Sequence, residues 1–288
     1  MLLNGLKTIQ QGVLMVSCLL NGGLISQYTM AGEQEMSNKQ KVTALLKSIE
    51  TGDAGPVSFI NPDKYIQHNL AVPDGLAGFG AVLQSLPEGS AKVNTVRIFE
   101  DGDYVFAHTE YNFFGPKIGF DIFRFENDKI VEHWDNLQVT PDNLNPSGRS
   151  MIDGSTELLD RDKSQENKRL VKNFVTDILV KGDMKKLSVY FEGDNYLQHN
   201  PNIGDGLSGL ERAFEAMSNQ GISMEYTKVH KVLGEGNFIL VVSEGALADQ
   251  PTSYYDLFRV ENGKIAEHWD TIETIPPRSE WQNENGKF

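Results

Sequence analysis

The sequence predicts an α+β protein made of two tandem copies of one domain, because long stretches occur twice and each copy reads as helices followed by strands. Residues 120–135 (FDIFRFENDKIVEHWD) and residues 255–270 (YDLFRVENGKIAEHWD) are identical at 11 of 16 positions. A second pair, YIQHN at 65–69 and YLQHN at 196–200, repeats at a similar distance along the chain. Self-similarity on this scale indicates an internal duplication.

The expected organisation follows from where the two copies begin and end. A chain of 288 residues fits two domains, each long enough to bury a core of its own. The segment between the copies is rich in Pro, Asn, Ser, Gly and Asp, which is the composition of a linker. We expect an N-terminal extension or weak signal at 1–35, a first domain at 36–140, a linker at 141–165, a second domain at 166–277 and a tail at 278–288.

The composition of the chain limits its partners. A net charge of −14 disfavours nucleic acid and anionic membrane surfaces, because both attract Lys and Arg. The single cysteine, Cys18, excludes a disulfide framework and a cysteine-based zinc site. We expect a small molecule as the partner, and neither nucleic acid nor a membrane.

The first 35 residues lie outside the duplication. Their apolar run, residues 12–20, is shorter than the ~20 residues that span a bilayer. The segment fits a weak secretory signal, with Lys7 before the run and Ala31-Gly32 near a cleavage position, and it also fits an upstream extension. We expect a cytoplasmic protein, with export through this segment as the alternative.

Each copy opens with a helical pattern. From Val42 to Ile49, apolar residues recur at the i, i+3, i+4, i+7 spacing of one helix face, and Ser37 is a suitable N-cap. Residues 170–179 carry the equivalent stripe in the second copy. Shorter helices are expected after the two Asp-Gly-Leu turns, over 76–86 and 207–218.

The remainder of each copy is strand-like. Runs rich in β-branched and aromatic residues are separated by hairpin signals, among them Asn262-Gly263. Helices followed by an antiparallel meander indicate a domain with its helices on one sheet face. The expected strands are 92–100, 104–114, 120–126 and 130–138 in the first copy and 223–233 and 238–246 in the second, with a final hairpin around Asn262-Gly263.

Candidate chemistry lies in the repeated His-Trp-Asp motif. Side chains alternate between the two faces of a strand, so His133 and Asp135 share one face and Trp134 lies on the other. Such a pair is close enough to share a ligand, and a partly desolvated Asp has a raised pKa that suits a general base near neutral pH. His268 and Asp270 repeat this pair in the second copy. A purely structural hydrogen bond between the two side chains is the alternative.

Further candidates stand elsewhere in the repeated motifs. His68 and His199 are expected between helices and sheet, where a pocket mouth would lie. Asp121 and Asp256 each precede an Arg by three residues, which fits a pocket carboxylate or a salt bridge.

A metal site is a weaker interpretation. Together, His68, His133 and Asp135 match the two-histidine, one-carboxylate ligand set of iron and zinc sites. Nothing in the sequence fixes their convergence, and we expect no metal and no cofactor.

Several motifs together resemble the SnoaL-like branch of the nuclear transport factor 2 superfamily. These are Tyr-Ile-Gln-His-Asn, Asp-Gly-Leu-x-Gly, the hairpin at residues 102–105 (GDYV), and Asp-Ile-Phe-Arg-Phe before Lys-Ile-Val-Glu-His-Trp-Asp. The resemblance covers about 36–140 and 165–275. It implies, in each copy, a cone of three helices on a strongly curved, mostly antiparallel sheet around a hydrophobic cavity. Related folds house ketosteroid isomerase and polyketide cyclases, which use Asp and His without metal or cofactor.

The resemblance also implies roles for individual residues. A late Asp is the base of the polyketide cyclases, which matches Asp135 and Asp270. The residues implied to assist or to polarise a carbonyl are His133, His68 and Asp121 in the first copy and His268, His199 and Asp256 in the second. The residues expected to bind substrate are Gln67, Asn69, Trp134, Gln198, Asn200 and Trp269.

Two functions therefore stay open. The first is a cofactor-independent acid/base enzyme, a lyase, isomerase or aldol-type cyclase, acting on a small and mostly apolar carbonyl compound. The second is a non-catalytic ligand-binding or assembly module of the same fold. Since related folds dimerise through their sheets, the two copies are expected to pair as an intramolecular pseudo-dimer, with further homodimerisation open. The second site is expected to be the better preserved, because Asn200-Pro201 is the commoner family form.

Overall fold

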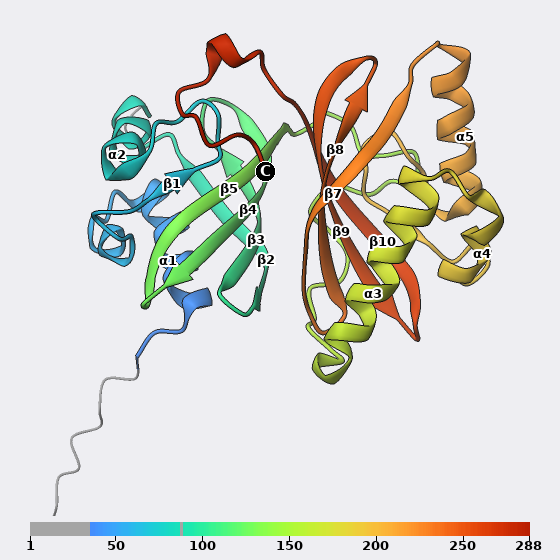
Figure 1. Ribbon diagram of the computed structural model, residues 1–288, viewed down its shortest axis with the longest axis horizontal. Helices are drawn as coiled ribbons and strands as arrows, with labels where there is room; N and C mark the ends of the chain where they lie inside the picture. The colour runs from blue at the N-terminus through green and yellow to red at the C-terminus, as the bar shows by residue number, and fades with distance from the viewer. Residues whose placement is uncertain (1–34, 87–88) are drawn as a thin grey trace, which may run out of the picture. The chain divides into compact units, whose positions relative to one another are not determined.

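The computed structural model describes residues 35–86 and 89–288 (Figure 1). Residues 36–288 form one compact unit. The expectations for the N-terminal extension concern residues that lie outside the described ones. In the part of the chain that the structure describes, no helix has the length and apolar character needed to cross a membrane.

Two five-stranded sheets carry the fold. The first contains β1 (Ile66–Gln67), β2 (Lys92–Asp101), β3 (Tyr104–Asn112), β4 (Pro116–Glu126) and β5 (Lys129–Val139), and the second contains β6 (Leu197–Gln198), β7 (Met224–Glu235), β8 (Phe238–Leu247), β9 (Gln250–Glu261) and β10 (Lys264–Thr274). Their strand orders, β1-β5-β4-β3-β2 and β6-β10-β9-β8-β7, are equivalent. The two short strands pair in parallel and all other pairs are antiparallel. The predicted α+β class is confirmed.

Two-residue turns join the last two strands of each sheet. Asn127 and Asp128 have φ angles of 48° and 66°, and Asn262 and Gly263 have φ angles of 50° and 72°. Positive φ at both central positions is what a type I′ turn requires, and Asn, Asp and Gly tolerate it best. The turns therefore set the register in which the His-Trp-Asp strands pair with their neighbours.

Helices cover one face of the first sheet. The helix α1 (Asn38–Thr51) begins at the expected N-cap, where the Ser37 hydroxyl accepts a hydrogen bond from the backbone of Gln40. The Gln40 side chain accepts one in return from the Ser37 backbone, which completes a capping box. Its apolar stripe is buried against the sheet. The other helices of this half are the 3₁₀ helix η1 (Gly55–Phe59) and α2 (Gly75–Ser85).

The second sheet is covered by α3 (Ser164–Phe174), the π-helical η3 (Val175–Val180), α4 (Leu187–Tyr190) and α5 (Gly206–Asn219), and Figure 1 shows α3, α4 and α5 on one side of it. The helix predicted from the apolar stripe at 170–179 thus corresponds to α3 and η3, which form one continuous helix with a π-helical end. Its buried residues include Val171, Phe174 and Ile178. The remaining 3₁₀ helices are η2 (Arg161–Lys163), η4 (Met184–Lys186) and η5 (Arg278–Glu280).

The two sheets pack against each other through the faces that carry no helices. One core cluster contains buried residues of both halves, including Trp134 and Trp269. The Arg97 guanidinium of β2 lies 4.1 Å from the ring centroid of Trp269, and the Lys231 ammonium of β7 lies 4.2 Å from that of Trp134. Each half therefore supplies a cation to the tryptophan of the other.

The linker, which follows the first half, packs on the second half, where His199 Nδ1 lies 2.8 Å from the Ser150 carbonyl oxygen. The tail, which follows the second half, packs on the first half, where His68 Nδ1 lies 2.8 Å from the Gly286 carbonyl oxygen. The polar linker even contributes a buried side chain, Met151, to the core between the sheets.

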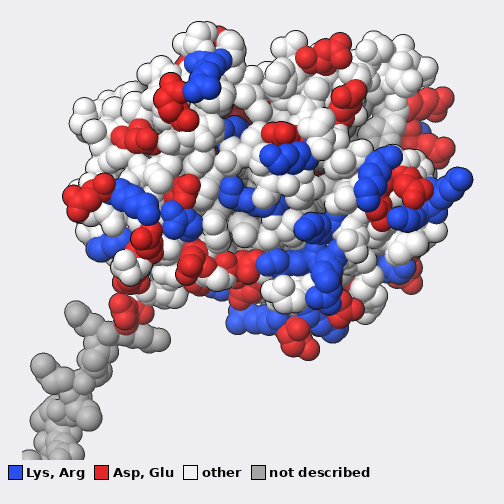
Figure 2. Space-filling view, viewed as in Figure 1, with Lys and Arg blue, Asp and Glu red and all other residues white. Residues whose placement is uncertain are grey.

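Charged side chains of opposite sign lie close together on the surface. Figure 2 shows Lys and Arg next to Asp and Glu over much of one face. Some pairs join the two halves, among them Lys39 with Glu235 at 3.0 Å and Lys168 with Asp101. The expectation of neither a nucleic acid nor a membrane partner remains a prediction.

Candidate functional site

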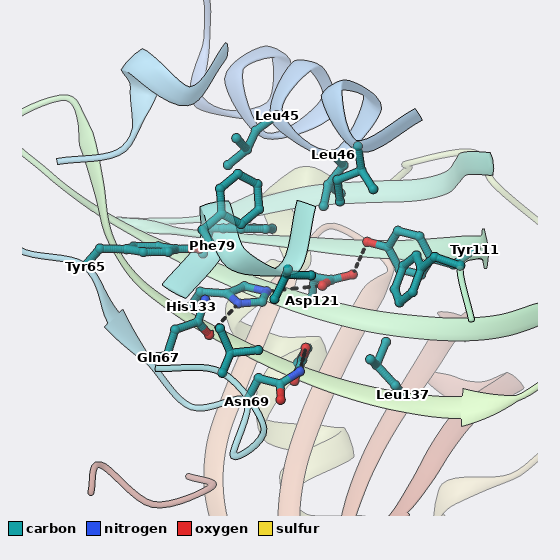
Figure 3. Close-up of a pocket in the computed structure, with 16 residues that line it drawn as sticks. Leu45, Leu46, Tyr65, Gln67, Asn69, Phe79, Tyr111, Asp121, His133 and Leu137 are labelled. Carbon is teal, nitrogen blue, oxygen red and sulfur yellow. Dashed lines mark hydrogen bonds and ion pairs between the residues drawn. The ribbon is translucent and has the colours of Figure 1, made fainter. Parts of the chain in front are cut away.

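A small apolar cavity lies between the helices and the sheet of the first half. It measures about 100 Å³, and Figure 3 shows α1 above it with Leu45 and Leu46 pointing inward. Its polar lining comes from Gln67, Asn69, Asp121, His133 and Asp135, with Tyr65 and Tyr111, and its apolar lining comes from Leu45, Leu46, Ile49, Val72, Phe79, Val82, Phe113, Phe123 and Leu137. The strand alternation that placed His133 and Asp135 on one face therefore directs both into this cavity.

His133 is held from both sides in the first cavity. Its Nε2 lies 3.2 Å from Asp121 Oδ1, and its Nδ1 lies 3.0 Å from Gln67 Oε1 (Figure 3). The Tyr111 hydroxyl donates to the other oxygen of Asp121 at 2.8 Å. Burial raises the pKa of Asp121, and the neighbouring His133 opposes this shift.

Asp135 stands beside this pair. The Asn69 side-chain amide donates to its Oδ2 at 2.6 Å, whereas its Oδ1 is buried and has no hydrogen-bond partner among the described residues. The Lys287 ammonium lies 3.8 Å from that oxygen and donates to Glu273 at 2.6 Å. Both Lys287 and Glu273 belong to the second half and its tail, so a distant part of the chain brings a cation close to Asp135.

The second half holds a matching but larger cavity of about 190 Å³. Asp256, His268, Asp270 and Gln198 line it together with Tyr196 and Tyr226. The rest of its wall is apolar and consists of Phe174, Ile178, Leu179, Met184, Ile203, Leu210, Phe214, Met224 and Phe258.

The hydrogen bonds of Gln198 define the protonation of His268. The Oε1 atom of Gln198 accepts the backbone N–H groups of His199 and Asn200, both at 2.9 Å, which identifies it as the amide oxygen. His268 Nδ1, 2.9 Å away, is therefore the donor toward it. His268 Nε2 lies 3.0 Å from Asp256 Oδ1, and a contact this short between two acceptor atoms contains a proton. The His268–Asp256 pair thus holds one transferable proton.

Asp270 is the least satisfied group of the second cavity. The Asn200 amide donates to Oδ2 at 2.7 Å, whereas Oδ1 is buried and meets no donor in the described part of the chain. The pKa of Asp270 is raised to about 6, mainly by burial, while the charge of His268 opposes this shift and the nearby Asp256 carboxylate adds to it. A carboxylate that loses its proton near pH 6 inside an apolar cavity has the properties of a general base.

Four tyrosines that the sequence analysis did not single out line these cavities, Tyr65 and Tyr111 in the first and Tyr196 and Tyr226 in the second. Burial raises the pKa of Tyr196 well above 10. Gln198 Nε2 donates to the Tyr196 oxygen at 3.4 Å, so the phenol can direct its own proton to a ligand. Their position in the sequence could have identified Tyr65 and Tyr196, because each is the first residue of a copy of the repeated Tyr-x-Gln-His-Asn motif.

The structure corrects the expected position of two histidines. Neither His68 nor His199 lines its cavity. His199 stacks on Trp269, with ring centroids 4.7 Å apart and 12° between the ring planes, and its Nε2 lies 2.9 Å from Glu267. His68 stacks in the same way on Trp134 at 4.5 Å. Both histidines lie on the sheet face opposite the cavity, so they do not meet a ligand inside it.

The same correction applies to the two tryptophans. Trp134 and Trp269 were expected to bind substrate, but both are buried in the core between the two sheets. They alternate with the cavity-facing His and Asp along their strands, and the face left to them is the one that packs on the other half.

The carboxylates and histidine of each cavity also have spacings that ligands of a cation can have. One ligand atom each from Asp256, His268 and Asp270 lies within 4.8 Å of the others, and the same holds in the first cavity. One imidazole and two carboxylates suit several divalent cations. The His268–Asp256 hydrogen bond already uses two of these three ligand atoms. A hydrogen-bonded group that holds a proton therefore explains the spacings as well as a cation site does. The expectation of no metal and no cofactor remains a prediction.

Fold and site together define a class: an α+β protein with two helix-covered sheets, each enclosing an apolar cavity with a buried Asp-His-Asp group. No family model and no curated protein matches the chain. Solved structures resemble parts of it. An NTF2-like protein of unknown function from Cytophaga hutchinsonii is 11% identical, over 37% of this chain and 94% of its own, with a TM-score of 0.33.

Two further solved structures resemble a similar share of the chain. An LEH-like epoxide hydrolase from M. tuberculosis is 22% identical, over 38% of this chain and 85% of its own, with a TM-score of 0.30. An NTF2-like protein from Burkholderia xenovorans is 19% identical, over 38% of this chain and 92% of its own, with a TM-score of 0.31.

Proposed function

We propose that the second half is a cofactor-independent acid/base catalyst that moves a proton next to the carbonyl group of a small, mostly apolar compound. The observation that carries this proposal is Asp270 Oδ1, a buried carboxylate oxygen without a hydrogen-bond partner among the described residues, on the wall of an apolar cavity. An engineered apolar cavity of about 150 Å³ binds benzene, so about 190 Å³ suits a six-membered ring.

Each polar group of the cavity has a role in this reaction. The Asp270 carboxylate removes a proton from the carbon beside the carbonyl, so the C–H bond breaks, an O–H bond forms and the electron pair moves to the carbonyl oxygen. The Tyr196 hydroxyl donates a hydrogen bond to the resulting enolate. Return of the proton to another carbon gives an isomerase, and loss of a leaving group gives a lyase. The His268–Asp256 pair supplies or accepts the second proton.

The comparison between the cavities favours the second half as the catalytic one. The unpartnered oxygen of Asp135 has the Lys287 ammonium 3.8 Å away, whereas that of Asp270 faces no ion pair among the described residues. The two unpartnered oxygens therefore differ in the charge next to them. The first cavity is also the smaller one. We propose that the first half binds a small ligand without turnover. In this half, the chain would act as the non-catalytic ligand-binding module considered as the alternative function.

We further propose that residues 36–140 and 166–277 are two copies of one domain, paired inside the chain as a pseudo-dimer. The exchange of Arg97 and Lys231 between the tryptophans of the two halves supports this pairing.

The test is hydrogen exchange at the carbon beside a ketone. Cyclohexanone in D₂O is incubated with the protein, and incorporation of deuterium is followed by proton NMR. The wild-type protein is expected to incorporate deuterium faster than buffer alone. In Asp270→Asn, this protein-dependent rate should fall about 10²–10⁴-fold, as for removal of a general base. Asp135→Asn is the matched control and should retain it. Unchanged exchange in Asp270→Asn with a folded protein would exclude Asp270 as the base.

A further inference from the structure

A second hollow adjoins the catalytic cavity proposed above. It measures about 540 Å³ and lies between α5 and the ends of β7, β8 and β10. Ile203 and Met224 line both spaces, so the two share a wall. Asn200, which holds Asp270 in place, also lines the hollow. The outer hollow therefore lies directly beside the inner cavity, next to the residue that holds the proposed base.

The sequence of α5 explains why this space is open. Leu210 and Phe214, large side chains in the middle of the helix, line the inner cavity. Ala213 and Ala216, which line the hollow, have the smallest apolar side chains. They lie on one face of the helix, three residues apart. A helix normally packs large apolar residues on a sheet, so this pair of alanines leaves room beneath the end of α5.

The first half carries larger residues at two of the matching positions. Ala213 corresponds to Val82 in the repeat alignment, and Leu247, which lines the hollow at the end of β8, corresponds to Phe113. Both Val82 and Phe113 line the first cavity. The helix also differs in length, because α5 has 14 residues and α2 has 11.

We propose that the outer hollow binds the apolar tail of a substrate whose carbonyl head occupies the inner cavity. The substrate class is a neutral ketone with an alkyl or flat aryl tail, and the identity of the head rests on the proposed function. The wall contains no Asp, Glu, Lys or Arg among the described residues, so a charged tail would lose its hydration without gaining a partner. The full wall consists of Asn200, Asn202, Ile203, Ala213, Ala216, Met217, Gln220, Ile222, Met224, Leu247, Ala248 and Ile272.

The test is the dependence of binding on tail length. Affinities of the methyl ketones from 2-butanone to 2-nonanone are measured by calorimetry on the Asp270→Asn protein, which separates binding from turnover. In a filled apolar site, each buried CH₂ group is expected to tighten binding about fourfold. Ala216→Trp fills the hollow and should abolish this increment while leaving the affinity for 2-butanone unchanged.

Ser85→Trp is the matched control, because Ser85 is the repeat counterpart of Ala216, ends α2 and is exposed. It should bind the whole series as well as its parent does. Ala213→Leu narrows the same hollow and serves as a second variant if the tryptophan disturbs α5.

The inference is overturned if the increment in affinity per CH₂ group survives both Ala216→Trp and Ala213→Leu. It is also overturned if the Asp270→Asn protein, the parent of these variants, shows no such increment. The fate of the proposed function is decided separately by cyclohexanone exchange. Length-dependent binding without any exchange would refute the catalytic role and keep the tail site.

Discussion

The ammonium group of Lys287 lies 3.8 Å from Oδ1 of Asp135. The linker residue that follows Ser150 is Met151, whereas the tail residue that follows Gly286 is Lys287, and the Ser150 and Gly286 carbonyl oxygens lie 2.8 Å from His199 and His68, respectively. One half thus has a cation near its unpartnered carboxylate oxygen, and the other has an apolar side chain in the core between the sheets. The charge beside the unpartnered carboxylate oxygen is therefore one difference between the two sites, and the volume of the cavity is another.

Lys287→Met is expected to destabilise the protein. The ammonium is buried and donates to Glu273 at 2.6 Å, so its loss leaves a half-buried carboxylate without its cation. The loss of this charged hydrogen bond should cost about 1–3 kcal/mol, measured as the free energy of unfolding in urea. Adding Glu273→Gln to this variant should recover much of the loss. Equal stability of Lys287→Met and wild type would show that the pair contributes nothing.

Asp270→Asn is expected to stabilise the protein in a pH-dependent way. The pKa of Asp270 is raised from 3.8 to about 6 in the folded state, mainly by burial. Its protonated form therefore favours folding below pH 4, and this contribution is lost as pH rises through 6. Above that pH, the ionised group costs about 3 kcal/mol at most.

Unfolding free energies of Asp270→Asn and wild type are therefore compared at pH 4 and pH 8. We expect a gain of about 2–3 kcal/mol at pH 8 and little change at pH 4. The exposed Asp63→Asn is the control and should show neither effect. An equal gain at both pH values would mean that the substitution acts through something other than the charge.

The proposed exchange reaction should depend on the same ionisation. Because Asp270 acts as a base only when ionised, the catalysed rate should rise with pH, reach half its plateau near pH 6 and level off above it. The measurement is the rate of deuterium incorporation between pH 4.5 and pH 8, corrected for buffer. A flat profile over this range would contradict a base of this pKa.

Tyr196→Phe tests the hydrogen-bond donor. Since burial keeps the phenol protonated, its removal should slow exchange about 10²-fold and leave the pH midpoint unchanged. Tyr65→Phe changes the corresponding tyrosine of the first cavity and should have no effect on the rate. If both variants exchange at the wild-type rate, the enolate is stabilised by another group.

His199→Ala separates a structural role from a binding role. The imidazole stacks on Trp269 and is hydrogen-bonded to Ser150 and Glu267, so its loss should lower the free energy of unfolding by about 3 kcal/mol. The affinity of the second cavity for cyclohexanone, measured where the variant is fully folded, should stay the same. Weaker binding at unchanged stability would place His199 in the ligand site after all.

Much of the fold could be predicted, because the signals that specify it are local. The Ser37 N-cap, the Asn262-Gly263 turn and the alternation of His133, Trp134 and Asp135 all follow from short stretches of chain. Periodicity did not reveal the π-helical end of the helical run over 170–179, because that turn depends on packing rather than on spacing.

The candidate site could be predicted in part. Strand alternation identified the face shared by His268 and Asp270, whereas His199 was expected on the wrong side of the sheet. The reason is that the motif carrying His199 runs along β6, next to β10, where successive side chains again alternate. Gln198 therefore points into the cavity, and His199 points toward the core between the sheets.

The sequence by itself determined the repeated pattern, the α+β class and the pairing of His and Asp on one strand face, because identity at fixed spacing and a two-residue period are properties of the chain alone. Only the tertiary structure decided that a cation lies beside Asp135. The residue responsible, Lys287, lies far along the chain from the strand that carries Asp135, and it reaches its place because the tail packs on the first half. Burial and charge at a site depend on everything packed around it, which no local pattern contains.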